Sequence, residues 1–267
     1  MRKFFLGALL VAVFLALISI WLDRGTLYLN GKIDRDFVER IEKFPKSQLK
    51  TIVIDSPGGT YRDAIDAANL IFDNNIELVV DGKCYSACAS ILLASSTNVS
   101  IKSGSLIAFH NMVGFWHYFE EYLQNNEDFS IAGFQVYRDS DEVISIYKRS
   151  GINPDFFVAL AAFHRINCIG VDRNPEGGDV TRLRMITEAE LYIPNEALFR
   201  QFGWKFKEAH FPDEAELRAF LKEMDQERGT GVFAAEDPNY KFPQELVDAG
   251  LYIESVQFCD QGMNPSI

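Results

Sequence analysis

Short apolar runs alternate with segments of helical periodicity along residues 26–112, and this alternation constrains the fold more than any other feature. Residues 51–55 and 76–80 are compact apolar runs typical of strands buried on both faces. Residues 60–73, between them, place small and apolar side chains at helical spacing. Further elements follow the same patterns, with strands expected at 26–31, 99–101 and 106–109 and helices at 34–44 and 86–93. The alternation predicts an α/β fold of parallel units with right-handed crossovers, and functional groups at the carboxyl ends of the strands.

The chain beyond residue 112 has a different organisation. Residues 140–149 and 155–164 have the pattern of two helices separated by a break, which together form a helical hairpin inserted after the core. Further helices are expected to begin at Thr187 and to span 213–227. The predicted divisions are an N-terminal segment at 1–25, a main domain at 26–205, and a C-terminal helix with an extension at 206–267.

The N-terminus carries a membrane-anchor signal. Arg2 and Lys3 precede an uncharged run over residues 4–22 whose only clearly polar member is Ser19. As a transmembrane helix this run rises roughly 28 Å, about the thickness of a bilayer's hydrocarbon core. The positive charges predict a single pass through a bacterial inner membrane, with the following domain in the periplasm. A cleaved signal peptide is the alternative, but residues 18–22 offer no small-x-small cleavage site.

The composition limits the partners. A net charge of −12 argues against nucleic acid, because phosphate binding requires basic patches. The chain has four cysteines, and export would permit disulfides. Cys84 and Cys88 can pair if a helix begins between them, and Cys168 with Cys259 is the other obvious pair. No metal or other cofactor is expected, since the cysteines lack a second metal-spaced pair of ligands.

Three short motifs fall at junctions of the β/α pattern. Gly58 and Gly59 follow a buried strand, where two glycines let the backbone turn sharply and leave N–H groups open to an oxyanion. Ser86 stands at the start of a helix, where the helix dipole and the amide of Ala87 can assist acyl transfer. His110 ends a later strand and can act as a general base. Taken singly, the motifs are equally typical of a tight turn, a helix cap and a core histidine.

Together the motifs resemble those of the proteolytic subunit of Clp protease and its relatives. The matching residues are Ser56-Pro57-Gly58-Gly59, Gly82-x-x-x-Ser86-Ala87 and Ser105-Leu106-Ile107-Ala108-Phe109-His110. The match covers roughly residues 26–112. The resemblance implies a crotonase-like ββα superhelix in which Ser86 is the nucleophile and His110 the base. It also implies an oxyanion hole formed by the amides of Gly59 or Gly58 and of Ala87.

The aspartate of that family has no clear counterpart. Residues 185–191 are similar to the family's segment after its aspartate, but Leu183 stands where the acid belongs. Asp179 and Asp172 are the nearest acids, and Asp179 is the favoured candidate. A Ser-His dyad oriented by a backbone carbonyl or by Asn167 is the alternative.

These features predict a membrane-anchored periplasmic serine peptidase that hydrolyses peptide bonds of peptides or proteins through an acyl-enzyme. Self-association is expected, because the relatives form trimers, hexamers or heptameric rings. One alternative is a Ser/Lys protease resembling signal peptide peptidase, with Lys83 or Lys102 as the base. The other is a scaffold or adaptor that keeps the fold without turnover, a hypothesis that the missing aspartate motivates.

Overall fold

The computed structural model describes residues 25–110, 135–157, 159–160, 166–173, 180–187, 191–228, 232–234 and 257–258. The expected anchor at 4–22, the candidate acid Asp179 and most of the C-terminal extension lie outside these residues. Among the helices within them, none is both long enough and apolar enough to cross a membrane.

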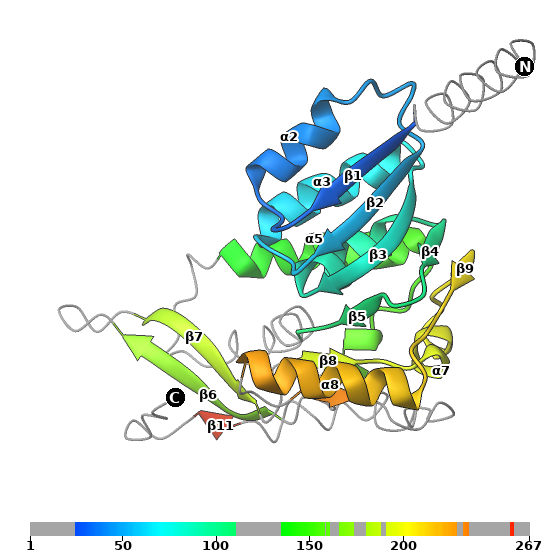
Figure 1. Cartoon of the computed structure of the whole chain (residues 1–267). Coiled ribbons are helices and arrows are strands. Elements are labelled where there is room, and N and C mark those ends of the chain that lie inside the picture. The colour runs from blue at the N-terminus through cyan, green and yellow to red at the C-terminus, as the bar shows by residue number, and fades with distance from the viewer. Residues whose placement is uncertain are drawn as a thin grey trace, which may run out of the picture.

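A parallel sheet forms the centre of the molecule (Figure 1). Its strands are β1 (Thr26–Asn30), β2 (Thr51–Ser56), β3 (Glu77–Tyr85), β4 (Val99–Ile101), β5 (Leu106–Ala108) and β9 (Glu208–Ala209). The order is β1-β2-β3-β4-β9, and each neighbouring pair is parallel. On the β4 side, β3 pairs first with β4 and then, through its second half, with β5. The parallel β/α organisation expected from the sequence is therefore present.

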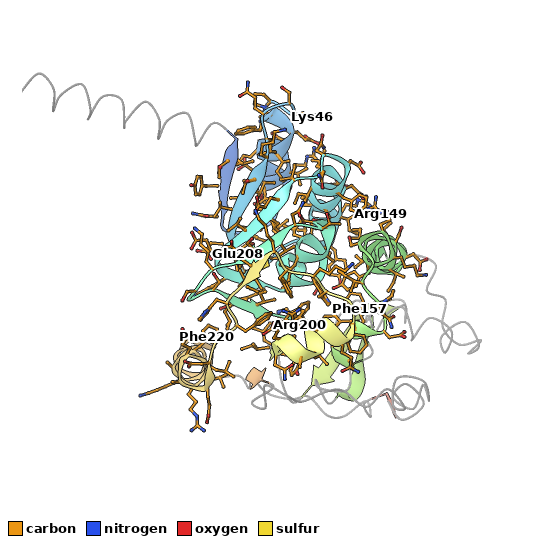
Figure 2. All side chains as sticks on the ribbon, turned by 90° about the vertical axis from the view of Figure 1, so that its right-hand side faces the viewer. Lys46, Arg149, Phe157, Arg200, Glu208 and Phe220 are labelled. Carbon is orange, nitrogen blue, oxygen red and sulfur yellow. A yellow bond between two sulfur atoms is a disulfide. The ribbon has the colours of Figure 1, made fainter. Side chains whose placement is uncertain are left out.

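Helices gather on one side of this sheet (Figure 1). The long ones are α2 (Arg35–Lys43), α3 (Tyr61–Asp73) and α5 (Gln135–Ser150). A π-helix (Cys88–Leu92) and a turn of 3-10 helix (Leu93–Ser95) lie between β3 and β4. All of them contribute buried apolar side chains to one core shared with the sheet. Figure 2 shows the sheet and its helices at right angles to the view of Figure 1, with Arg149 of α5 and Glu208 of β9 on opposite sides of the core.

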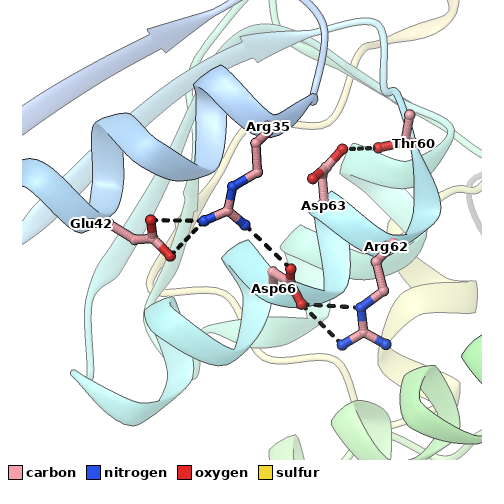
Figure 3. A network of polar contacts seen from close by, with 6 residues as sticks. All are labelled: Arg35, Glu42, Thr60, Arg62, Asp63 and Asp66. Atoms are coloured by element: carbon pink, nitrogen blue, oxygen red, sulfur yellow. Dashed lines mark hydrogen bonds and ion pairs between the residues drawn. The ribbon is translucent and has the colours of Figure 1, made fainter.

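Ion pairs link the exposed surfaces of these helices (Figure 3). Arg35 binds Glu42 of its own helix at 2.9 Å and reaches Asp66 of α3 at 3.5 Å. Asp66 also pairs with Arg62 at 2.9 Å, and Arg62 binds Glu142 of α5 at 2.7 Å. Because all these side chains are a third or more exposed, each pair adds little stability by itself. The buried apolar faces hold the helices in place.

A second layer covers the end of the sheet that carries β5. It contains β8 (Leu191–Ile193), α7 (Glu196–Gln201), α8 (Glu214–Arg228) and β10 (Val232–Ala234), which is parallel to β8. Side chains of β3, β5, β8 and α8 form a separate apolar cluster, namely Tyr85, Leu106, Ala108, Leu191, Ile193 and Leu217. α8 therefore packs beside the residues that lead into the Ser86 turn.

Several strands lie where the sequence patterns did not indicate them. β6 (Ile166–Arg173) and β7 (Val180–Thr187) form an antiparallel pair, and β11 (Gln257–Phe258) is parallel to β6. The helix expected to begin at Thr187 is wrong: Thr187 ends β7, and β8 begins at Leu191. Burial explains why residues 191–193 form a strand, because Leu191, Tyr192 and Ile193 are all enclosed between other strands and helices. The helix begins instead at Glu196, and the side chain of Asn195 caps it by accepting the N–H of Leu198.

Candidate active site

The three sequence motifs come together at the carboxyl ends of neighbouring strands. β2 ends at Ser56, β3 at Tyr85 and β5 at Ala108. In the sheet register Ser56 is opposite Cys84, and Tyr85 is opposite Ala108. Three segments therefore leave the same edge of the sheet side by side, namely the glycine turn after β2, the Ser86 turn after β3 and the residues after β5. Functional sites in open parallel sheets are found at this edge.

Ser86 adopts a conformation that few residues other than glycine take. Its φ is 54°, in the left-handed region, which costs on the order of 1–3 kcal/mol for a side-chain-bearing residue. Two backbone hydrogen bonds hold it there. Its N–H donates to the Ala108 carbonyl at 3.0 Å, and its own carbonyl accepts the N–H of Ser90 at 2.8 Å. Ser86 is thus the sharp strand-to-helix turn itself, rather than the first helical residue, and it stays half-buried.

The glycine turn packs directly against this serine. Gly58 has a φ of 94°, and a Cβ placed on it would lie 2.6 Å from the Tyr85 carbonyl oxygen and 2.7 Å from Ser86 Cβ. The same atom would be 3.1 Å from the amide nitrogen of Ala87. Only glycine allows this approach. The amide of Gly58 is already used, because it donates to the buried Ser56 hydroxyl at 3.1 Å.

The amides of Gly59 and Ala87 are differently placed. A parallel bridge joins Ile33 to Gly59, through hydrogen bonds that use the Gly58 carbonyl and the Thr60 N–H. In such a bridge the N–H of Gly59 itself is directed away from Ile33, to the side on which β3 lies. Ala87 precedes the π-helix, and the first amides of a helix have no carbonyl of their own helix to bind. Both amides are therefore suited to binding an anion beside Ser86.

An irregularity in β3 sets the position of the Ser86 turn. The strand expected at 76–80 is longer than its apolar run, because β3 continues to Tyr85. Its pairing with β2 shifts in this stretch. The Asp55 carboxylate fills the gap by accepting the N–H of Lys83 at 2.8 Å, and the hydroxyl of Ser105 accepts the N–H of Gly82 at 3.0 Å. Sequence reasoning gave no role to the Asp55 side chain and named Ser105 only as the first residue of the motif that ends at His110.

Backbone hydrogen bonds to β8 fix the segment that leads from β5 to His110. Phe109 forms an antiparallel bridge with Tyr192, with N–H to carbonyl bonds of 2.8 Å and 2.9 Å. The Phe109 ring packs in an aromatic cluster, with ring centroids 5.2 Å from Phe156 and 5.9 Å from Phe199. His110 follows immediately and is half-buried, so its backbone leaves the sheet beside the Ser86 turn.

A disulfide encloses the turn. Cys84, near the end of β3, is bonded to Cys88, the first residue of the π-helix, as the spacing allowed. Both residues are fully buried in the main core. The chain between them consists of Tyr85, Ser86 and Ala87.

The remaining candidate residues lie outside the described part of the chain or in other parts of the fold. Asp179 lies outside the described residues. Asp172 and Asn167 belong to β6, in the antiparallel pair with β7. Lys102 binds Asp81 at 2.6 Å on the exposed surface, which occupies the amine that a Ser/Lys mechanism would need. Across the described part of the chain, no group of three or more His, Cys, Asp or Glu residues could hold a metal ion.

Comparison with known proteins gives no family assignment. No protein-family model and no curated protein sequence matches the chain. Among solved structures, it is similar to a mutant of ClpP1 from Listeria monocytogenes, with 13% identity and a TM-score of 0.38, over 75% of this chain and 99% of that one. It is also similar to a mutant of a membrane-bound stomatin-specific protease in complex with a substrate peptide, with 13% identity and a TM-score of 0.28. That match covers 45% of this chain and spans 65% of the length of the other.

Proposed function

We propose that this chain is a serine peptidase with Ser86 as nucleophile and His110 as general base. One observation carries the proposal. Ser86 stands in a left-handed turn between β3 and a helix, with Gly58 packed on its Cβ and the amide of Ala87 beside it. Because the conformation is costly for serine and ordinary for glycine, a serine there points to a use for its hydroxyl.

The reaction follows from these positions. The Ser86 hydroxyl attacks the carbonyl carbon of a peptide bond while His110 takes its proton. The amides of Gly59 and Ala87 bind the oxyanion of the tetrahedral intermediate, and His110 then protonates the leaving amine. Water, deprotonated by His110, hydrolyses the acyl-enzyme. Gly59, rather than Gly58, is the donor in this scheme because the Gly58 amide is bound to Ser56.

We further propose that the domain works outside the cytoplasm, anchored to the inner membrane by residues 4–22. Two features support this. The run at 4–22 is long and uncharged, with Arg2 and Lys3 before it. The chain also holds a disulfide between Cys84 and Cys88, and such bonds are rare in proteins of the reducing cytosol. Self-association stays a prediction, which sedimentation of the full-length protein would test.

The test is labelling of the full-length protein, purified in detergent micelles, with a fluorophosphonate that reacts with activated serines. Ser86→Ala should abolish labelling, and His110→Ala should slow it at least a hundredfold, the usual size of general-base assistance. Ser103→Ala and His210→Ala are the matched controls, since Ser103 is exposed, His210 is half-buried beside Glu216, and both lie away from the Ser86 turn. Both should label at the wild-type rate.

Other outcomes would reject specific parts of the proposal. Absence of labelling in a folded wild type would reject an activated Ser86 and favour the scaffold. Loss of labelling in Ser86→Ala but not in His110→Ala would leave the nucleophile in place and reject the base. Loss on Lys83→Ala or Lys102→Ala, with His110→Ala fully active, would favour the Ser/Lys mechanism.

A further inference from the structure

We infer that the disulfide between Cys84 and Cys88 is a positioning device for the candidate nucleophile, holding Ser86 in its left-handed turn. The inference rests on the proposed function for its catalytic consequence, but its structural part can be tested separately. It assigns Cys84 and Cys88 as positioning residues, because they act through the backbone of Ser86 and do not touch a substrate.

The disulfide joins two fixed parts of the molecule across the turn. Cys84 sits in the sheet, opposite Ser56 of β2 and Ile107 of β5. Cys88 begins the π-helix, in the core between the sheet and α3. The two Cα atoms are 5.2 Å apart, so the chain must reverse within Tyr85, Ser86 and Ala87. A covalent bond at this point fixes where the turn begins and where it ends.

Global stabilisation does not account well for a disulfide in this place. Cross-links stabilise largely by restricting the unfolded chain, and the effect grows with the length of the closed loop. Here the loop is among the shortest that a disulfide can close, because only three residues separate Cys84 from Cys88. The restriction of the unfolded chain is correspondingly small. What the bond does restrict is the local geometry of the three enclosed residues.

Ser86 needs such a restraint more than most residues do. Without it the φ angle of 54° can relax toward the negative region that a serine prefers. Relaxation would rotate the Ser86 side chain and the Ala87 amide together, since one peptide unit joins the two residues. Gly58 lies against Ser86 Cβ and the Ala87 amide nitrogen, so even a small rotation would alter the candidate oxyanion site. The disulfide thus protects the mutual placement of nucleophile and oxyanion donors.

The burial of the bond separates this role from that of a redox switch. Both cysteines have no exposed surface, so the folded protein shields the sulfur atoms from reductants in solution. Labile, regulatory disulfides are characteristically exposed or strained. The Cys84–Cys88 bond is therefore a fixed part of the site, made once during folding in an oxidising environment.

The experiment compares wild type with Cys84→Ala/Cys88→Ala in the full-length protein. Ile71→Ala, a buried truncation in α3 away from the turn, serves as the control for lost stability. The first readout is amide hydrogen exchange of residues 85–90. The second is the rate of fluorophosphonate labelling as a function of probe concentration, which separates probe binding from the bond-forming step. Cys84→Val/Cys88→Ala, which keeps more of the buried volume, replaces the first variant if that one does not fold.

The amide hydrogens of residues 85–90 should exchange at least tenfold faster in the double variant than in wild type. The exchange rates in β1 and α2 should match those of Ile71→Ala. The bond-forming step of labelling should slow on the order of tenfold to hundredfold, the size expected for a misplaced reacting group, while probe binding stays unchanged. Unchanged local exchange would overturn the inference, whether or not the wild type labels. Faster local exchange with an unchanged labelling rate would also overturn it. A wild type that does not label rejects the proposed function, and exchange alone then decides whether the disulfide fixes the turn.

Discussion

The backbone N–H of Ser86 donates to the carbonyl oxygen of Ala108 at 3.0 Å, so the turn after β3 is tied to the last residue of β5. Residues from two different β/α units thereby reach one place through main-chain bonds alone. His110 follows Ala108 by two residues, so the candidate nucleophile and base share the same small piece of sheet.

Ser86→Gly should be more stable than Ser86→Ala, although both variants lack the candidate nucleophile. Glycine tolerates the left-handed conformation that alanine does not, so Ser86→Gly should unfold with a free energy about 1 kcal/mol higher than Ser86→Ala. Urea unfolding of the two variants measures the difference, and neither should label with fluorophosphonate. Equal stabilities would contradict a left-handed conformation at this residue.

Gly58→Ala should be strongly destabilising. The added Cβ would combine an unfavourable φ with a clash against the Tyr85 carbonyl and Ser86, costing about 2–4 kcal/mol of unfolding free energy. Gly104→Ala is the matched control, because Gly104 also has a positive φ, of 78°, but has nothing within 4 Å of its added Cβ. It should cost only about 1 kcal/mol. Similar losses in the two variants would show that the close approach of Gly58 is not formed.

Asp55 should support the Ser86 turn from a distance. Asp55→Ala removes the acceptor of the exposed Lys83 N–H, which should lower the unfolding free energy by about 0.5–1.5 kcal/mol. Asp55→Asn keeps an oxygen acceptor in the same place and should lose clearly less. Calorimetric or urea unfolding would rank the three proteins, and an equal loss in both variants would assign the effect to charge instead of the hydrogen bond.

The ion pairs between α3 and α5 should matter less than the apolar contacts beneath them. A double-mutant cycle on Arg62 and Glu142 should give a coupling of less than about 1 kcal/mol that shrinks in salt, because both side chains are partly exposed. Val143→Ala, which truncates a buried side chain in α5, should cost about 1–3 kcal/mol. Urea unfolding at two salt concentrations measures both, and the reverse ranking would refute this account of the packing.

The start of α8 should loosen in acid. The pKa of Glu216 lies below its ordinary value, because the carboxylate accepts the N–H of Asp213 and also binds His210. A carboxyl with a lowered folded-state pKa stabilises the fold above its unfolded-state pKa, and this contribution is lost as pH falls through the folded-state pKa. The stability difference between wild type and Glu216→Gln should therefore disappear in acid. Urea unfolding of the two proteins across the acid range measures it, and a difference that persists at the lowest pH would contradict the role of the Glu216 carboxylate.

The sequence could predict the parallel β/α half because each element there has a local cause. Apolar runs gave β2 and most of β3, Asp34 caps α2 by accepting the N–H of Phe37, and a glycine marks the turn at Gly58. The end of β3 was misplaced because its continuation depends on the side chains of Asp55 and Ser105, which reach it from other strands. The strand β8 was missed because its partners, β10 and the Phe109 bridge to Tyr192, are far away in sequence.

The candidate site was predictable to a similar extent. Gly58 and His110 follow strand ends that the sequence pattern located, whereas Ser86 was expected at a helix start and instead follows the end of β3, which was misplaced. The choice between the amides of Gly58 and Gly59 was not predictable, because it depends on the Ser56 hydroxyl and on the bridge from Gly59 to Ile33. The role of a third catalytic residue stays a prediction, since Asp179 lies outside the described residues.

The bridge between Phe109 and Tyr192 has a consequence for the order in which the protein becomes complete. A ribosome adds Ser86 and His110 long before Tyr192, yet the strand leading to His110 is secured on its outer side by Tyr192. A nascent chain halted between these points has its candidate nucleophile but lacks the backbone bridge beside its candidate base. Under the proposed function, cleavage by a partly synthesised chain is thereby disfavoured until the second layer has been made.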